Sequence, residues 1–359
     1  MATAERYVFN PDYAIPPGAT LKEVLDSKGI SQAELAIRMG MADKTISQII
    51  NGIAPISFDT AYKLELVLGI AASFWNRLEL AYRERLTLAD ETQKLNADVA
   101  WLKELPVKEL VQRHLVEPTN DKAVMVRRLL EFFGVSSVEA WRGVLAGAAI
   151  QFRGGKSHSK YPGYVAAWRR IGVLQAQEIQ TEAFDAQDFG KALDSVRAVT
   201  MRPATKWFTE LTSICAKAGV CVVLTKEIPR ASVSGSARWL TKDKALIQLS
   251  LKYKSDDQIW FSFFHEAGHI LNHGKKDLFV DYGYSEDDAL EREANDFARN
   301  KLIPPEFEKY LPHLTNSARI RKFASDIGVS PGIVVGRLHH DQLAPRHKFQ
   351  DLIARVDWE

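Results

Sequence analysis

The chain has 359 residues, of which 46% are hydrophobic and 26% charged, with a formal net charge of +2. These values are ordinary for a soluble globular protein and leave room for two or three domains. Cys215 and Cys221 are too few for a disulfide framework, the N-terminal residues lack an apolar secretory segment, and the longest apolar run, 66–75, is too short to span a bilayer. We therefore expect a cytoplasmic protein with no membrane partner.

Close-spaced helical patterns fill residues 20–75. Ser31 and Glu34 form a capping box, because each side chain can satisfy a backbone N–H group at the start of the second helix. Gly40 then makes a turn, and a third helix is predicted over 43–51. Short helices with a glycine turn between the second and third match a helix-turn-helix.

The segment LAIRMGMADKTISQIINGIAPIS (35–57) resembles the XRE class of repressors, and its NGIAPIS ending looks most like the antitoxin-type branch. The resemblance implies that the third helix enters the major groove of double-stranded DNA. Gln and Asn can pair with adenine there, while Lys, Ser and Thr reach guanine or phosphate. The outward residues of this helix are Lys44, Thr45, Ser47, Gln48 and Asn51.

A helical bundle used only for dimerisation or protein contact is the alternative. Residues 1–85 carry nine Lys/Arg against ten Asp/Glu, a balance that gives little phosphate neutralisation. The polar outward face of the third helix, free of acids after Asp43, favours DNA binding. A homodimer is left open.

Residues 81–205 are predicted as a helical connector, without an internal repeat. Within it, 151–170 holds five Lys/Arg and no Asp/Glu. A basic stretch with aromatics can contact nucleic acid, but a solvated Gly/Ser-rich loop followed by a helix is favoured.

From residue 206 the pattern changes. A helix leads into the strand GVCVVLT, and SARWL and ALIQLSL form a hairpin around TKDK. A helix bearing FSFFHEAGHILNH (261–273) follows, then another near 287–302, and at least two more occupy 315–359. The tail echoes a second helix-turn-helix, but Ser330 and Pro331 are typical of a helix start, and a helical cap is favoured. The predicted fold is mainly α with a small β-sheet (α+β).

The segment FSFFHEAGHILNH (261–273) carries the chemistry. A helix places His265 and His269 on one face, where their imidazoles can bind one metal ion, with Glu266 beside them. Two nitrogens and one carboxylate are ligands that suit zinc. Zinc lowers the pKa of the water bound to it, and Glu266 can then remove a proton from that water. Buried polar side chains on so apolar a helix would be costly without such a partner.

A third ligand is required, and the helix ALEREANDFARNKL (289–302) offers Glu291 and Glu293. Glu291 lies closer to the centre of its apolar face and is chosen, with Asn295 one turn on as a hydrogen-bond partner for it. His273 is predicted at an exposed helix end, because three histidines on one straight helix cannot surround a tetrahedral ion.

An oxyanion-stabilising residue is also needed. Tyr253, Tyr282 and Tyr284 are near in sequence, and nothing distinguishes one of them.

The segments SARWLTKDKALIQLSL, WFSFFHEAGHILNHG and EREANDFA resemble the ImmA/IrrE family of metallopeptidases over about 206–305. The resemblance implies a gluzincin-like zinc site: His265, His269 and Glu291 as ligands, and Glu266 as general base. It also implies cleavage of helix-turn-helix repressors, which induces genes after stress or in mobile elements.

The sequence thus predicts four parts: a helix-turn-helix domain (15–80), a connector (81–205), a zinc metallopeptidase domain (206–312) and a helical cap (313–359). The predicted function is hydrolysis of a protein substrate, with a repressor as the candidate, and with the helix-turn-helix providing targeting or regulation. The alternative is a DNA-binding regulator or antitoxin-like protein whose metal domain senses or scaffolds without cleaving.

Overall fold

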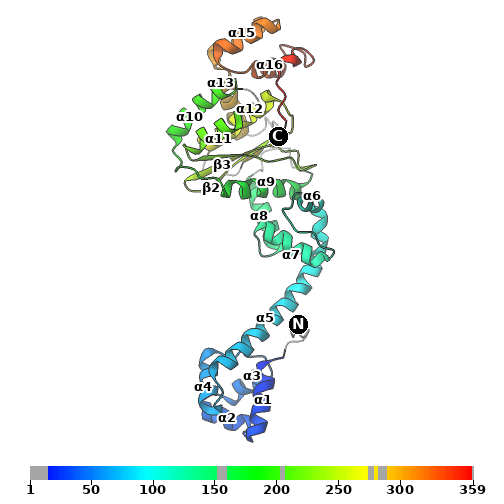
Figure 1. Cartoon of the computed structure of the whole chain (residues 1–359), viewed down its shortest axis with the longest axis vertical. Coiled ribbons are helices and arrows are strands. Elements are labelled where there is room, and N and C mark those ends of the chain that lie inside the picture. Colours follow the sequence, from blue (N-terminus) through cyan, green and yellow to red (C-terminus); the bar gives the residue numbers. More distant parts are fainter. Residues whose placement is uncertain (1–14, 152–159, 203–206, 274–278, 282–288, 358–359) are drawn as a thin grey trace, which may run out of the picture. The chain divides into compact units, whose positions relative to one another are not determined.

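A computed structural model describes residues 15–151, 160–202, 207–273, 279–281 and 289–357. Over the whole chain, two compact units are formed, Met1–Val99 and Ala100–Glu359. The predicted α+β class is confirmed, because helices dominate and one small sheet lies in the C-terminal unit (Figure 1). The described helices include none with both the length and the apolar character that a membrane span requires.

The N-terminal unit is built from helices around one apolar core. Its helices are α1 (Pro17–Lys28), α2 (Gln32–Met39), α3 (Asp43–Ile50), α4 (Phe58–Leu68) and α5 (Ala72–Ala97). Ile46 and Ile49 point inward from α3, and Leu64 meets them from α4. The backbone N–H of Glu34 donates to Ser31 Oγ at 3.2 Å, so this half of the predicted capping box is confirmed. The Glu34 carboxylate instead pairs with Arg38.

A buried carboxylate joins α5 to the loop that follows α3. Glu79 is 9% exposed, and its Oε2 accepts the backbone N–H of Ile56 at 3.1 Å. Its Oε1 accepts from Arg83 Nε at 2.6 Å. Hydrogen bonds to a charged group are stronger than neutral ones, so Glu79 fixes the NGIAPIS loop against α5.

The C-terminal unit contains the remaining elements. Its helices are α6 (Val107–Gln112), α7 (Lys122–Phe133), α8 (Val138–Gln151), α9 (Pro162–Gln177), α10 (Ala186–Val199), α11 (Trp207–Ala216), α12 (Asp256–Asn272), α13 (Ala289–Leu302), α14 (Pro305–Glu308), α15 (Ser317–Ile327) and α16 (Pro331–His340). Short 3-10 helices occupy Asp98–Glu104 (across the unit boundary), Leu311–His313 and Gln350–Leu352.

Four strands form the sheet in the order β1-β3-β2-β4. These are β1 (Val220–Leu224), β2 (Gly235–Thr241), β3 (Lys244–Leu249) and β4 (Phe279–Asp281). The predicted hairpin is confirmed, because β2 and β3 pair antiparallel. β1 pairs parallel with β3, and β4 adds an antiparallel edge to β2.

Side chains alternate between the two faces of this sheet, as the period of a strand requires. On β1, Val220 and Val222 join the core shared with α11 and α12, whereas Cys221 and Val223 meet Ala176 of α9 on the other face. The sheet therefore separates α9 from α10, α11 and α12 (Figure 1). Both cysteines are buried free thiols.

Helices α9 and α10, within the predicted connector, contribute to these layers, and α16 packs against α12. Ser330 Oγ accepts the backbone N–H of Ile333 at 3.4 Å, which confirms the predicted helix start. The boundaries placed at residues 81, 206 and 313 stay predictions.

Candidate metal centre

The two motif histidines lie on α12, which is the most deeply buried helix around the site. His265 and Glu266 are 0% exposed and His269 is 1% exposed. Asp257 stands in the first turn of α12, where negative charge interacts favourably with the helix dipole. The apolar residues between the motif positions pack on the sheet and hold the helix in place.

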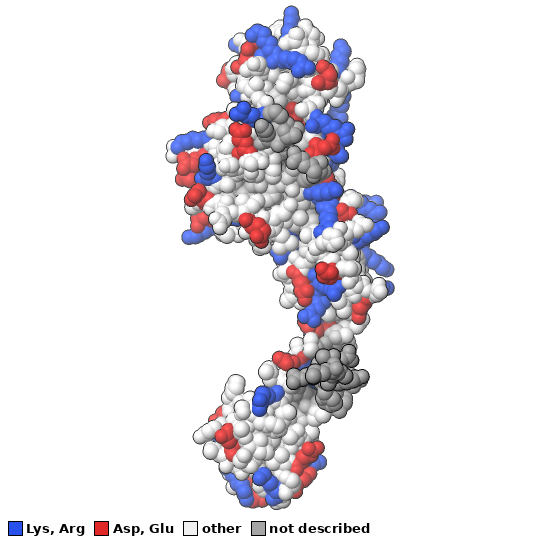
Figure 2. All heavy atoms as spheres, viewed as in Figure 1, with Lys and Arg blue, Asp and Glu red and all other residues white. Residues whose placement is uncertain are grey.

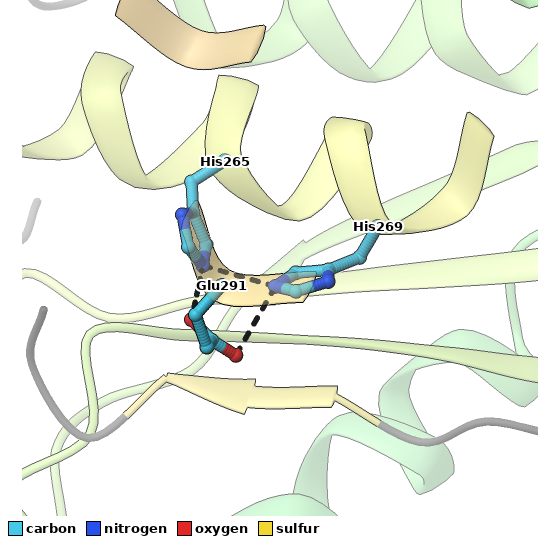
Figure 3. A group of neighbouring side chains, drawn as sticks. All are labelled: His265, His269 and Glu291. Atoms are coloured by element: carbon cyan, nitrogen blue, oxygen red, sulfur yellow. Dashed lines mark hydrogen bonds and ion pairs between the residues drawn. The ribbon is translucent and has the colours of Figure 1, made fainter. Parts of the chain in front are cut away.

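α13 packs closely against α12 beside the motif. A Cβ added at Gly268 would lie 3.3 Å from the Cα of Ala294 and 3.1 Å from the ring of Phe297, so a small residue is needed at this crossing. This close approach brings the first turn of α13, with Glu291, over the two histidines (Figure 3).

Three donor atoms converge between the helices. The Nε2 atoms of His265 and His269 lie 3.0 Å apart. The Glu291 carboxylate lies 3.2 Å from the first of them and 3.5 Å from the second. Ligand atoms at about 2.1 Å from a tetrahedral zinc ion would be separated by about 3.4 Å, so the three side chains fit such an ion.

The electrostatic state of the histidines also suits a metal. Burial, together with the neighbouring His265 and His273, lowers the pKa of His269 well below its usual range, so its imidazole is neutral. A neutral imidazole offers one lone pair to a metal ion.

His265 bonds to Asn295, a residue predicted as a partner of Glu291. Its Nδ1 lies 3.0 Å from Oδ1 of Asn295, a residue that is 3% exposed. Because an amide oxygen only accepts, Nδ1 of His265 carries the proton and Nε2 keeps its lone pair. The prediction that Asn295 bonds Glu291 is therefore replaced by a hydrogen bond between Asn295 and His265. Phe261 stacks on the same imidazole, with ring centroids 6.3 Å apart.

The side chain of Glu266 lies against strand β2. A Cβ added at Gly235 would lie 2.6 Å from its Oε1 and 2.9 Å from its Cγ. Gly235 was not among the predicted site residues, although a glycine directly before the strand SARWL can mark the close approach of another group.

The expectation of an exposed His273 is wrong. The residue does end α12, but its side chain is only 2% exposed and contacts both His269 and Glu293. Glu293 faces His273 rather than the three donor atoms. Tyr253 is half exposed at 47% and stacks with Lys252, while Tyr282 and Tyr284 lie outside the described residues.

The residues predicted to read DNA lie on or directly after α3. Lys44 and Asn51 are exposed, and Thr45, Ser47 and Gln48 are half-buried. The Asn51 side-chain amide donates to the Ser47 carbonyl oxygen at 2.8 Å, so it caps its own helix. On the face drawn in Figure 2, Lys/Arg and Asp/Glu side chains are interspersed over the N-terminal unit. Of the basic stretch 151–170, residues 152–159 lie outside the described residues.

Two segments of the chain match models of known protein families. A helix-turn-helix family model matches residues 21–75, and the model of the IrrE N-terminal-like domain, Peptidase_M78, matches residues 222–339. The uncharacterized HTH-type transcriptional regulator YddM of Escherichia coli (strain K12) is 33% identical over 66 residues, which are 18% of this chain and 70% of YddM.

Two solved structures resemble about a quarter of the chain. One is an addiction module antidote protein of a HigA family from Coxiella burnetii, at 28% identity and a TM-score of 0.22, covering 24% of this chain and 94% of that one. The other is a putative antidote protein of a plasmid maintenance system from Nostoc punctiforme, at 27% identity and a TM-score of 0.23, covering 23% and 92%. The chain belongs to the XRE-type helix-turn-helix family and carries, fused to that DNA-binding domain, an ImmA/IrrE domain of the Peptidase_M78 family.

Proposed function

We propose that this protein is a zinc-dependent metallopeptidase that cleaves a protein substrate, with His265, His269 and Glu291 as zinc ligands. The observation that carries the proposal is the convergence of two imidazole nitrogens and one carboxylate at 3.0 to 3.5 Å. Three electron-rich donors in so small a space are stabilised by a cation, and this donor set is typical of zinc.

Glu266 is proposed as the general base. When bound, zinc would polarise the peptide carbonyl and lower the pKa of the attacking water. Glu266 then takes a proton from that water and passes it to the amine that leaves. Glu266 directly follows the proposed ligand His265 in α12, and Gly235 leaves room for its carboxylate.

The helix-turn-helix is proposed to bring this activity to double-stranded DNA or to a DNA-bound protein, with a repressor as the substrate. Lys44, Thr45, Ser47, Gln48 and Asn51 are the proposed contacts. The match of residues 21–75 to the helix-turn-helix family supports DNA binding. Because Asn51 already bonds Ser47, we expect its contribution to base recognition to be smaller than that of Gln48.

The experiment compares wild type with Glu266→Gln. Zinc is measured by elemental analysis, and cleavage is followed on the helix-turn-helix repressor encoded nearest to this gene. We expect both proteins to hold one zinc per chain, and the variant to cleave about 10²- to 10⁴-fold more slowly. Cleavage by the variant at the wild-type rate would exclude Glu266 as the general base.

A non-cleaving regulator is the second candidate, and the name of YddM as a transcriptional regulator favours it. The same experiment separates the two functions. A wild-type protein that holds zinc and binds its own promoter region, yet leaves the repressor intact, would support the regulator.

A further inference from the structure

His273 occupies a position that the proposed reaction does not use. It follows the last turn of α12, one turn after His269, and its side chain is 2% exposed. Its Nδ1 lies 2.9 Å from Nδ1 of His269, and its Nε2 lies 3.4 Å from Oε2 of Glu293. These contacts form a chain from a half-exposed carboxylate to a buried imidazole.

The Glu293 carboxylate, at one end of this chain of contacts, determines the direction of each hydrogen bond in it. A carboxylate only accepts, so Nε2 of His273 donates to Glu293. A neutral His273 then has a lone pair on Nδ1, which accepts the proton that His269 carries on its own Nδ1. His269 is thereby held in the form whose Nε2 lone pair faces His265 and Glu291.

Both histidines of the motif are oriented from α13, but by different means. His265 is bonded directly to Asn295, whereas His269 is connected to Glu293 through His273. Residues 291–295 of α13 thus supply the third ligand and the outer partners of both imidazoles. Such outer partners fix the ring orientation of a ligand and raise its basicity.

We propose that His273 and Glu293 are positioning residues, which set the tautomer and ring orientation of His269 and so strengthen zinc binding. This inference rests on the proposed zinc site. Neither residue contacts the reacting atoms, so each acts only through His269.

Zinc dissociation constants, measured by competition with a chromogenic chelator, test the proposal. We expect His273→Phe to weaken zinc binding about 10- to 100-fold. His273→Gln should stay within about threefold of wild type, because its amide can accept from His269 and donate to Glu293. Glu293→Ala should weaken binding by less than His273→Phe, and should add nothing when combined with it.

Three further measurements keep the outcomes distinct. His313→Phe replaces an exposed histidine of the same unit and should leave zinc affinity unchanged. Circular dichroism checks that each variant is folded, and nitrogen-15 spectra of the zinc-loaded wild type should show His269 protonated at Nδ1. Equal affinities for wild type and His273→Phe, or additive losses in the double variant, would overturn the positioning role while leaving the zinc site intact. A wild-type chain that binds no zinc would remove the proposed function and this inference together.

Discussion

Gly235 of β2 lies directly against the side chain of Glu266, and a Cβ at this position would come within 2.6 Å of the carboxylate oxygen Oε1. Real Cβ atoms do not approach an oxygen so closely, so one of the two groups would have to move. Because Gly235 sits in a paired strand, between β3 and β4, the side chain of Glu266 is the group that yields. The strand therefore sets where the proposed base stands.

Gly235→Ala should keep zinc and lose cleavage. The added methyl group displaces the Glu266 carboxylate, and a displacement of about 1 Å can cost about 10²-fold in rate. Elemental analysis and the repressor cleavage assay measure the two effects. Gly190→Ala is the matched control, because nothing lies within 4 Å of a Cβ there, and it should match wild type in both. A Gly235→Ala protein that cleaves as fast as wild type would show that the carboxylate is not confined by β2.

Much of the candidate site could be predicted, because the positions of its residues depend on near neighbours in the sequence. The spacing of His265 and His269 fixes them on one helical face, and the apolar face of the following helix favours Glu291 over Glu293 as the third ligand. The hairpin and the helix starts at Ser31 and Ser330 depend on near neighbours in the chain, and the structure contains them.

The outer contacts could not be predicted, because they join elements whose crossing the sequence does not specify. Asn295 reaches His265 rather than Glu291 since α13 passes α12 at Gly268. The prediction for His273 depended only on its position at the C-terminal end of a helix, where a histidine side chain interacts favourably with the helix dipole. Packing of α13 buries that side chain and gives it a carboxylate.

Replacing Glu291 should abolish tight zinc binding. Glu291→Ala removes one of three donors, whereas Glu293→Ala removes only a group that acts through His273, so the first variant should lose far more affinity. Chelator competition measures both. A larger loss in Glu293→Ala would reassign the third ligand.

The N-terminal unit depends on the buried carboxylate of Glu79. Glu79→Ala leaves the backbone N–H of Ile56 without its acceptor and should lower the stability of this unit by about 1–3 kcal/mol. Hydrogen exchange of peptides from residues 17–68 reports the loss locally. Glu84→Ala, on the exposed face of the same helix, is the control and should change stability by less than about 0.5 kcal/mol. Zinc binding by the C-terminal unit should be the same in both variants.

Asp256 at the start of α12 should make the C-terminal unit less stable as the pH rises from about 4 to about 6. The residue is 6% exposed, and burial raises the pKa of its carboxyl from 3.8 to about 6, although Ser330 and the backbone N–H of Ala354 donate to it and oppose the shift. A raised pKa in the folded state means that the protonated carboxyl favours folding. This stabilisation is fully present below the unfolded pKa and is lost as the pH passes the folded value.

The amplitude would be about 2–3 kcal/mol, since each pKa unit corresponds to about 1.4 kcal/mol. Asp256→Asn cannot ionise and should lack this component. Chemical denaturation of both proteins in a metal chelator at pH 4.5, 5.5 and 7 measures the difference, and the chelator removes the separate pH dependence of zinc binding. We expect the variant to gain stability relative to wild type across this range. A constant difference between the two proteins at all three pH values would show that Asp256 keeps an ordinary pKa in the folded chain.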